Sequence, residues 1–141
     1  MFEKILIGHL IGDYLLQNKW MAMNKSGCTT KCAVHCLLYT ISICIATWCA
    51  SPLWIAIVFC SHFIVDRFSL ADKWLNLING RSLVDFIDNG MKDIPFVRHT
   101  ADSKYWNYHS LRGGFTSLVY AVTDNTMHLV LMLVGYRMVI Q

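Results

Sequence analysis

The chain contains four apolar segments, and each is close to the length that a helix needs to cross a lipid bilayer. A membrane-spanning helix requires about 20 consecutive, mainly apolar residues. Hydrophobic residues make up 55% of the 141 residues and charged residues only 15%, which is an unusual balance for a soluble domain. The sequence therefore predicts an all-α, integral membrane four-helix bundle that forms a single membrane domain over residues 1–141. The predicted helices cover about 2–23, 31–50, 53–74 and 115–138.

The basic residues between these segments predict the orientation of the bundle. The connection 19–31 holds three lysines and the connection 73–112 holds six basic residues, whereas the hairpin at Pro52 holds none. Because loops rich in Lys and Arg stay on the cytoplasmic side, we expect both charged connections to face the cytoplasm. The long connection, about 76–114, then forms a cytoplasmic cap between the third and fourth helices. This pattern predicts a multi-pass protein of the inner (cytoplasmic) membrane with both termini outside.

Three of the apolar segments carry a histidine and an aspartate four residues apart. On an α-helix, positions i and i+4 lie one above the other on the same face, so each pair presents an imidazole and a carboxylate to a common point. Ionisable residues at membrane depth are costly and rarely face lipid, so these carboxylates require compensating positive charge. Arg67 is the only basic residue within these helices near the pairs. The pairs are His9 with Asp13, His62 with Asp66, and Asp124 with His128.

A divalent metal satisfies this requirement best. One arginine cannot neutralise three aspartates, but one or two divalent cations can, with neutral imidazoles completing the ligand shell. His35 lies at a similar depth in the second predicted helix and adds a further ligand. Because three aspartates and four histidines exceed the needs of one ion, we expect a dinuclear site, for which zinc, manganese and iron are about equally suitable. The predicted metal ligands are His9, Asp13, His35, His62, Asp66, Asp124 and His128.

The leading functional hypothesis is a metal-dependent hydrolase, because two bridged ions activate water and stabilise a leaving oxygen. Asp13, Asp66 and Asp124 are the predicted catalytic carboxylates, one of them acting as general base. The expected substrate is a membrane lipid or another amphiphile with a phosphate or ester head group. Arginines near the expected cytoplasmic opening of the metal site are expected to bind an anionic head group. Anchoring by the positive-inside rule is the simpler explanation of the same residues. The predicted substrate-binding residues are Arg67, Arg98 and Arg112.

Other functions fit the same pattern. Chains of histidine and aspartate inside helices also pass protons or metal ions through transporters and channels, although the apolar outer half of the bundle would then require a homo-oligomer around one path. A non-catalytic membrane adaptor with a structural metal, whose cap binds a cytoplasmic partner, is a third possibility. Without a metal, each pair would be a buried hydrogen bond that locks its helix or relays a proton. The dispersed basic residues and the net charge of +3 argue against nucleic acid as a partner.

The six cysteines lie in or beside apolar segments, where cysteine behaves as a small hydrophobic residue. No disulfide framework is therefore expected. Cys28, Cys32 and Cys36 share a helical face near His35 and would allow a thiolate zinc site, but helix packing is the simpler explanation.

Several of these motifs resemble a known family. They are the opening His9-Leu-Ile-Gly-Asp13-Tyr-Leu-Leu-Gln17, His35 early in the second helix, and Ser61-His62-Phe-Ile-Val-Asp66. They resemble an uncharacterised family of small bacterial and phage membrane proteins (domain of unknown function 3307), over nearly the whole chain. The chain is similar, more distantly, to inner-membrane proteins regarded as metal-dependent hydrolases. The resemblance implies a metal at the residues listed above, and the Asp124–His128 pair, in reversed order, matches least closely.

Overall fold

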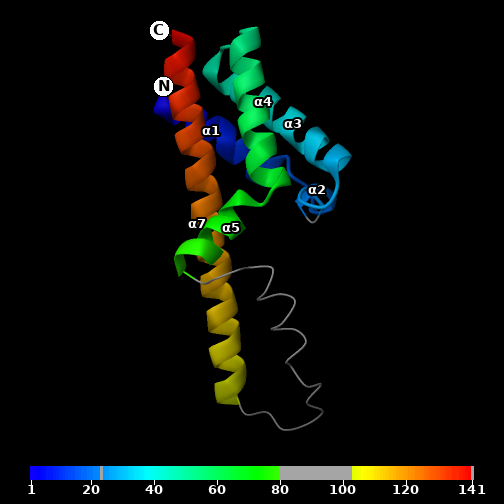
Figure 1. The fold of residues 1–141 in the computed structure, drawn as a ribbon, viewed down its shortest axis with the longest axis vertical. Coiled ribbons are helices and arrows are strands. Elements are labelled where there is room, and N and C mark those ends of the chain that lie inside the picture. Colours follow the sequence, from blue (N-terminus) through cyan, green and yellow to red (C-terminus); the bar gives the residue numbers. More distant parts are fainter. Residues whose placement is uncertain (23, 80–102, 141) are drawn as a thin grey trace. The chain divides into compact units, whose positions relative to one another are not determined.

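The computed structural model describes residues 1–22, 24–79 and 103–140, without the side chains of 79, 103–113 and 140. Every element within these residues is a helix, and Figure 1 shows their order along the chain. The elements are α1 (Phe2–Leu10), a π-helix (Ile11–Leu15), α2 (Lys19–Ala22), α3 (Thr29–Thr47), α4 (Pro52–Arg67), α5 (Leu70–Asn79) and α7 (Ser103–Ile140).

Within the described residues, two helices are long and apolar enough to cross a membrane. They are Thr29–Thr47, which is α3, and Gly114–Val139 within α7. A third span results if α4 and α5, which are separated by a short break, count as one bent span. Length and composition therefore mark the chain as a membrane protein and confirm the all-helical prediction for the described residues. The four-helix membrane bundle remains a prediction.

The first predicted helix, 2–23, is not continuous, which corrects the sequence prediction. α1 passes into the π-helix, in which the N–H of Leu16 donates to the carbonyl of Ile11 at 3.0 Å. A separate helix, α2, begins after Asn18, whose side-chain oxygen accepts from the N–H of Met21 at 3.0 Å. Asparagine is a favoured N-terminal capping residue, so it starts a new helix where the apolar run ends.

The second and third predicted helices correspond to α3 and α4, which pack against each other. α3 ends at Trp48, which adopts a left-handed conformation with φ 54°. The Ser51 hydroxyl then accepts a backbone N–H of α4 at 3.2 Å, and Pro52 occupies the first turn. The predicted hairpin with proline at a helix start is therefore confirmed. α4 is shorter than the predicted 53–74, because Ser69, with φ 49°, interrupts the helix before α5.

The last helix begins earlier than predicted. α7 starts at Ser103, inside the predicted cap, instead of near residue 115. No proline lies between 103 and 114, so the helix continues without a residue that would break its hydrogen bonding. Residues 80–102 of the predicted cap lie outside the described residues.

The chain divides into two compact units, Met1–Leu70 with Thr126–Gln141, and Ala71–Asn125. The second unit contains most of α5, where Ala71 and Leu75 are buried, and the N-terminal part of α7. The prediction of one membrane domain stays a prediction. The core of the first unit joins α1, α3, α4 and the end of α7 through Ile5, Tyr39, Ile43, Trp54, Val58 and Met132.

Two glycines allow α1 and the π-helix to approach α3 closely. A Cβ atom on Gly8 would lie 3.0 Å from the Ala46 side chain and 3.1 Å from the Ile43 backbone. A Cβ atom on Gly12 would lie 2.7 Å from the Tyr39 ring and 3.2 Å from the Tyr39 Cα. Small residues four apart are a common device for close packing of membrane helices. This approach places the side chains that follow Gly8 and Gly12 against α3.

Candidate metal centre

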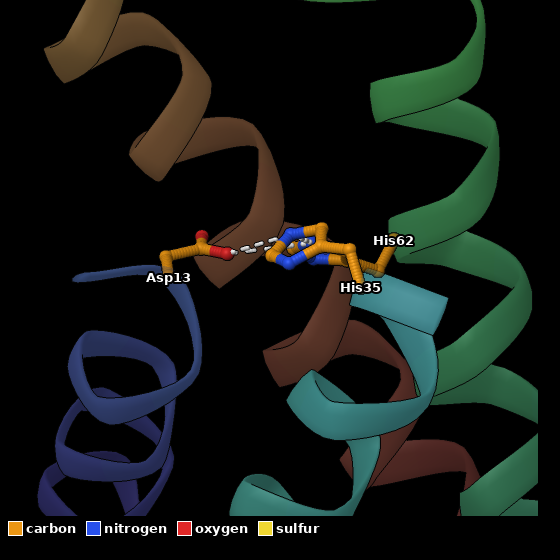
Figure 2. Close-up of side chains that lie close together, drawn as sticks. All are labelled: Asp13, His35 and His62. Carbon is orange, nitrogen blue, oxygen red and sulfur yellow. Dashed lines mark hydrogen bonds and ion pairs between the residues drawn. The ribbon is translucent and has the colours of Figure 1, made fainter. Parts of the chain in front are cut away.

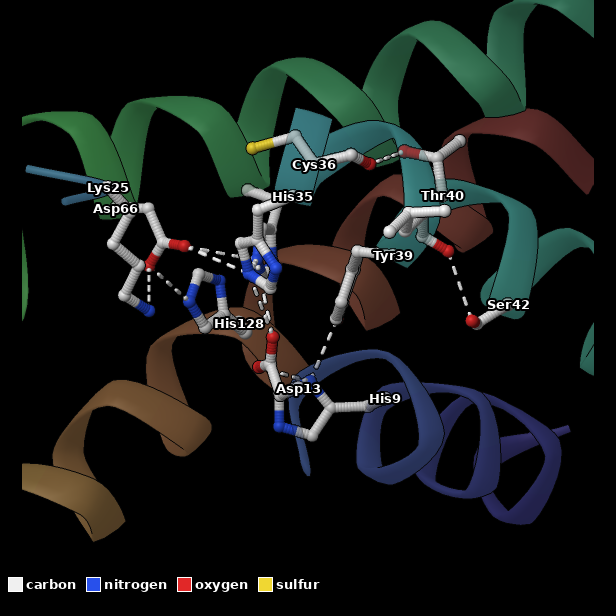
Figure 3. A network of polar contacts seen from close by, with 12 residues as sticks. His9, Asp13, Lys25, His35, Cys36, Tyr39, Thr40, Ser42, Asp66 and His128 are labelled. Carbon is white, nitrogen blue, oxygen red and sulfur yellow. Dashed lines mark hydrogen bonds and ion pairs between the residues drawn. The ribbon is translucent and has the colours of Figure 1, made fainter. Parts of the chain in front are cut away.

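The first unit gathers histidines and aspartates from α1, the π-helix, α3, α4 and α7 into one cluster (Figure 3). The histidines and Asp66 are buried, and Asp13 is partly exposed. These side chains come from separate helices and converge in one cluster. Its members are His9, Asp13, His35, His62, Asp66 and His128.

Asp13, His35 and His62 form a group that we call the first position (Figure 2). Their atoms make a small triangle, in which His35 Nε2 and His62 Nε2 are 3.0 Å apart. Oδ1 of Asp13 lies 3.2 Å from His35 Nε2 and 3.4 Å from His62 Nε2. Two imidazole nitrogens at this separation repel each other unless one carries a proton or both bind a cation.

The triangle has the dimensions of one face of a metal-ligand shell. For bonds of about 2.0–2.1 Å, neighbouring ligand atoms lie about 3.3–3.4 Å apart in a tetrahedral shell and about 3.0 Å apart in an octahedral shell. The observed separations of 3.0–3.4 Å cover both cases, so they fit a divalent ion without selecting zinc, manganese or iron. Asp13 Oδ1 is also buried without a hydrogen-bond partner among the described residues. Buried carboxylate oxygens are normally hydrogen-bonded, and an unoccupied acceptor of this kind is suited to a cation.

Asp66 lies between the first position and a second group, His62, Asp66 and His128, which we call the second position. Its Oδ2 is 3.2 Å from His35 Nε2 and 3.3 Å from His62 Nε2, and it has no hydrogen-bond partner among the described residues. Its Oδ1 is 3.4 Å from His128 Nε2. The rings of His62 and His128 are stacked with their centroids 4.0 Å apart. One carboxylate therefore contacts both positions, as a bridging carboxylate does in a dinuclear site.

A lysine contacts Asp66, whose neighbour in sequence is Arg67. Lys25 Nζ lies 2.8 Å from Asp66 Oδ1, and the side chains of the two residues are 14% and 1% exposed. Arg67 instead donates from Nε to the Thr29 hydroxyl at 3.2 Å and from Nη1 to the Ser26 carbonyl. These bonds join the end of α4 to the residues that precede α3. The sequence singled out Arg67 as the only basic residue within the predicted helices near the pairs. The structure adds Lys25, which contacts Asp66 from a loop 41 residues away in sequence.

Tyr39 is a further residue of the cluster that sequence reasoning missed. Its hydroxyl donates to Met132 Sδ at 3.1 Å and lies 2.8 Å from His9 Nδ1. Because the hydroxyl has one proton, which is directed to Met132, the Nδ1–H of His9 donates to the Tyr39 oxygen. His9 Nδ1 is also 3.4 Å from Asp13 Oδ2. Tyr39 follows His35 by four residues on α3, the same spacing as in the histidine–aspartate pairs, and that spacing could have revealed it. No comparable pattern points to Lys25.

Asp124, Arg98 and Arg112 are the remaining predicted site residues. Asp124 belongs to the second unit and is partly buried, so its role as a ligand stays a prediction. Arg98 lies outside the described residues, and so does the side chain of Arg112. Cys28, Cys32 and Cys36 are free thiols, and the metal-binding groups found among the described residues contain no cysteine.

The described residues define a class of protein. It is a helical membrane protein with buried His/Asp groups that can hold a metal ion. The chain belongs to the DUF3307 family, described as a protein of unknown function, whose model matches residues 1–141. Comparison with curated proteins and with solved structures gives no significant match. The family expected from the sequence motifs is therefore confirmed.

Proposed function

We propose that the chain is a membrane-embedded hydrolase that binds a divalent metal ion at the first position. The observation that carries this proposal is the buried triangle of Asp13 Oδ1, His35 Nε2 and His62 Nε2, with sides of 3.0–3.4 Å. Catalytic metal sites commonly use three protein ligands, because a remaining coordination position must be open to water or substrate. Two histidines and one carboxylate supply such a set.

The residues around the triangle suit hydrolysis. A divalent ion bound there would polarise an ester or phosphoryl oxygen and lower the pKa of coordinated water. Asp66 Oδ2 lies within 3.3 Å of both imidazole nitrogens without a hydrogen-bond partner among the described residues, so it can accept a proton beside the ion. Lys25 and His128 contact the other oxygen of the same carboxylate and orient it. In the proposed hydrolysis, Asp66 is thus the general base and Asp13 is a metal ligand.

The proposed substrate is a lipid or another amphiphile with a phosphate or ester head group, which reaches the centre from the inner membrane. Asp13 is the partly exposed member of the triangle, so substrate access on its side is consistent with the burial of the other members. The positive-inside pattern supports a centre that opens toward the cytoplasmic leaflet, with both termini outside.

Metal content and hydrolysis in matched variants test the proposal. Detergent-purified protein, prepared without chelators, is expected to contain zinc, manganese or iron by elemental mass spectrometry. Asp13→Asn and His35→Ala should lose the metal, whereas Glu3→Gln, which makes the same carboxylate-to-amide change on an exposed residue of α1, should retain it. The metal-loaded protein should then hydrolyse a phosphate or ester amphiphile from a fluorogenic panel, and Asp66→Asn should abolish that activity. A folded, metal-free wild type would exclude the metal centre, and a metal-loaded protein without activity on the panel would exclude hydrolysis of these substrate classes.

A second candidate function is the transport of protons or metal ions. The observation that favours it is a chain of polar contacts from His9 through Asp13 and His35 to Asp66 and Lys25, with each step between 2.8 and 3.4 Å. Such chains relay protons in membrane proteins. Flux of Mn²⁺ or protons into proteoliposomes, lost in Asp66→Asn and retained in Glu3→Gln, would favour transport over hydrolysis.

A further inference from the structure

Lys25 occupies a specific place in the cluster. Its ammonium nitrogen lies 2.8 Å from Asp66 Oδ1, the same oxygen that is 3.4 Å from His128 Nε2. Asp66 and His128, together with His62, form the second position. Because one imidazole nitrogen binds a single ion, His62 serves the first position when both are filled, and Asp66 and His128 are then the protein ligands of the second ion. The lysine ammonium therefore contacts the carboxylate oxygen that a second metal ion would need.

The backbone around Lys25 is tied down, so this contact does not depend on the lysine side chain alone. The N–H of Lys25 donates to the Met21 carbonyl at 2.9 Å, and the N–H of Cys28 donates to the Asn24 carbonyl at 2.8 Å. The carbonyl of Ser26, the next residue, accepts from Arg67 at the end of α4. The loop is thus attached to the same helix that carries Asp66, and Arg67 positions Lys25.

The charges of the cluster favour one divalent ion in the presence of Lys25. Asp13 and Asp66 contribute two negative charges, and Lys25 contributes one positive charge. One divalent ion leaves a single positive charge, which one hydroxide or one anionic substrate group neutralises. A second divalent ion beside the ammonium would leave three positive charges in a largely buried site and would compete with Lys25 for Asp66 Oδ1.

We propose that Lys25 is the second cation of this centre: the chain binds one divalent ion at the first position, and the second position accepts another only when the Lys25 ammonium is removed. The inference rests on the metal site of the proposed function. The sequence predicted two metal ions. This inference replaces the second ion with the ammonium of Lys25. The sequence pattern contains no sign of Lys25 at Asp66, so the two-ion prediction was made without it.

The test is a count of Mn²⁺ equivalents in full-length, detergent-solubilised protein, by equilibrium dialysis and by electron paramagnetic resonance, which detects a spin-coupled pair. Wild type is expected to bind one equivalent. Lys25→Met and Lys25→Gln should each bind two equivalents with a spin-coupled signal, because both remove the positive charge. Lys25→Gln is included because its amide can still donate a hydrogen bond to Asp66, so it changes the charge with less loss of contact. Lys25→Arg should bind one, because it keeps the charge. Adding His128→Ala to Lys25→Met should return the count to one.

Lys31→Met is the matched control, since Lys31 lies over the Trp20 ring at 5.0 Å and should not alter the count. Two equivalents in wild type would overturn the inference, and so would one equivalent in both Lys25→Met and Lys25→Gln while each elutes as a folded, helical protein. No equivalent in wild type or in any variant would instead refute the metal site itself, so the two failures are distinguishable.

Discussion

The ring of Tyr39 lies flat against the imidazole of His62, with 3.6 Å between the ring centroids and 23° between the planes. The same tyrosine contacts His9 and Met132 through its hydroxyl, at 2.8 and 3.1 Å. One side chain of α3 therefore orients histidines from α1 and α4 and also touches α7. Residues that hold metal ligands in place often influence metal affinity almost as strongly as the ligands themselves.

Two substitutions at Tyr39 should distinguish the contribution of its ring from that of its hydroxyl. Tyr39→Phe keeps the stack on His62 but leaves His9 Nδ1 without the tyrosine oxygen, so we expect a loss of about 1 kcal/mol in unfolding free energy and nearly unchanged Mn²⁺ binding. Tyr39→Leu removes the stack as well and should weaken Mn²⁺ binding about 10-fold or more. Thermal unfolding in detergent and Mn²⁺ titration measure the two effects. Equal Mn²⁺ affinity in wild type and Tyr39→Leu would show that the stack does not position His62.

Gly12→Ala should destabilise the first unit. The added Cβ would lie 2.7 Å from the Tyr39 ring and 3.2 Å from its Cα, and the ring cannot move freely because it is stacked on His62. We expect a loss of about 1–3 kcal/mol in unfolding free energy, together with weaker metal binding. Gly114→Ala is the control, because nothing lies within 4 Å of the added Cβ, and it should be neutral or stabilise α7 by up to about 1 kcal/mol. A Gly12→Ala protein as stable as Gly114→Ala would contradict the close approach of the π-helix to α3.

Asp66→Asn should be more destabilising in metal-free protein than Asp13→Asn, because it removes the carboxylate charge that the Lys25 ammonium contacts at 2.8 Å in a largely buried site. Removing one partner of a buried pair costs about 3–5 kcal/mol, and the 14% exposure of the Lys25 side chain places the expected loss at the lower end. Combining Asp66→Asn with Lys25→Met should recover much of this loss, since both charges of the pair are then removed. A double-mutant cycle from thermal unfolding measures the coupling, and strictly additive effects would argue against the ion pair.

Cys28 should react unusually fast with maleimides for a protein thiol. The backbone N–H of Lys31 at the start of α3 is the main cause that lowers the pKa of the Cys28 thiol, and the nearby charges of Lys31 and Arg67 act in the same direction. A lowered thiol pKa keeps more thiolate as the pH falls, so the alkylation rate at pH 7 should exceed that of glutathione. Cys28→Ser should remove this fast phase.

The same labelling experiment tests the predicted orientation of the protein. With a membrane-impermeant maleimide, Cys28 should be protected in intact cells and labelled after lysis, because the lysine-rich loop that contains it is expected to face the cytoplasm. Cys49, beside the hairpin at Pro52, is expected outside, so the signal of Cys28 is the part of the labelling that Cys28→Ser removes. If that part appears in intact cells, the assigned topology is reversed.

Local sequence rules predicted much of the architecture. Apolar runs predicted helices where α3, α4 and the second half of α7 lie, and the Ser51-Pro52 pair predicted the start of α4. The four-residue spacing correctly identified His9 with Asp13, and His62 with Asp66, as side chains on one face. These features depend on helix periodicity and capping, which act over a few residues and are therefore visible in the sequence alone.

Tertiary structure decided the composition of the cluster. Gly12, in the π-helix that carries Asp13, approaches Tyr39 closely, and the sequence did not identify Tyr39 as its neighbour. The contact between Lys25 and Asp66 joins residues 41 positions apart, whereas Arg67, the neighbour of Asp66 in sequence, donates to Thr29. A helical period specifies which face a side chain occupies, but the partners it meets depend on how helices pack and where loops return. For this reason the sequence could identify the histidines and aspartates as a group, whereas only the fold showed that a lysine contacts one of the aspartates.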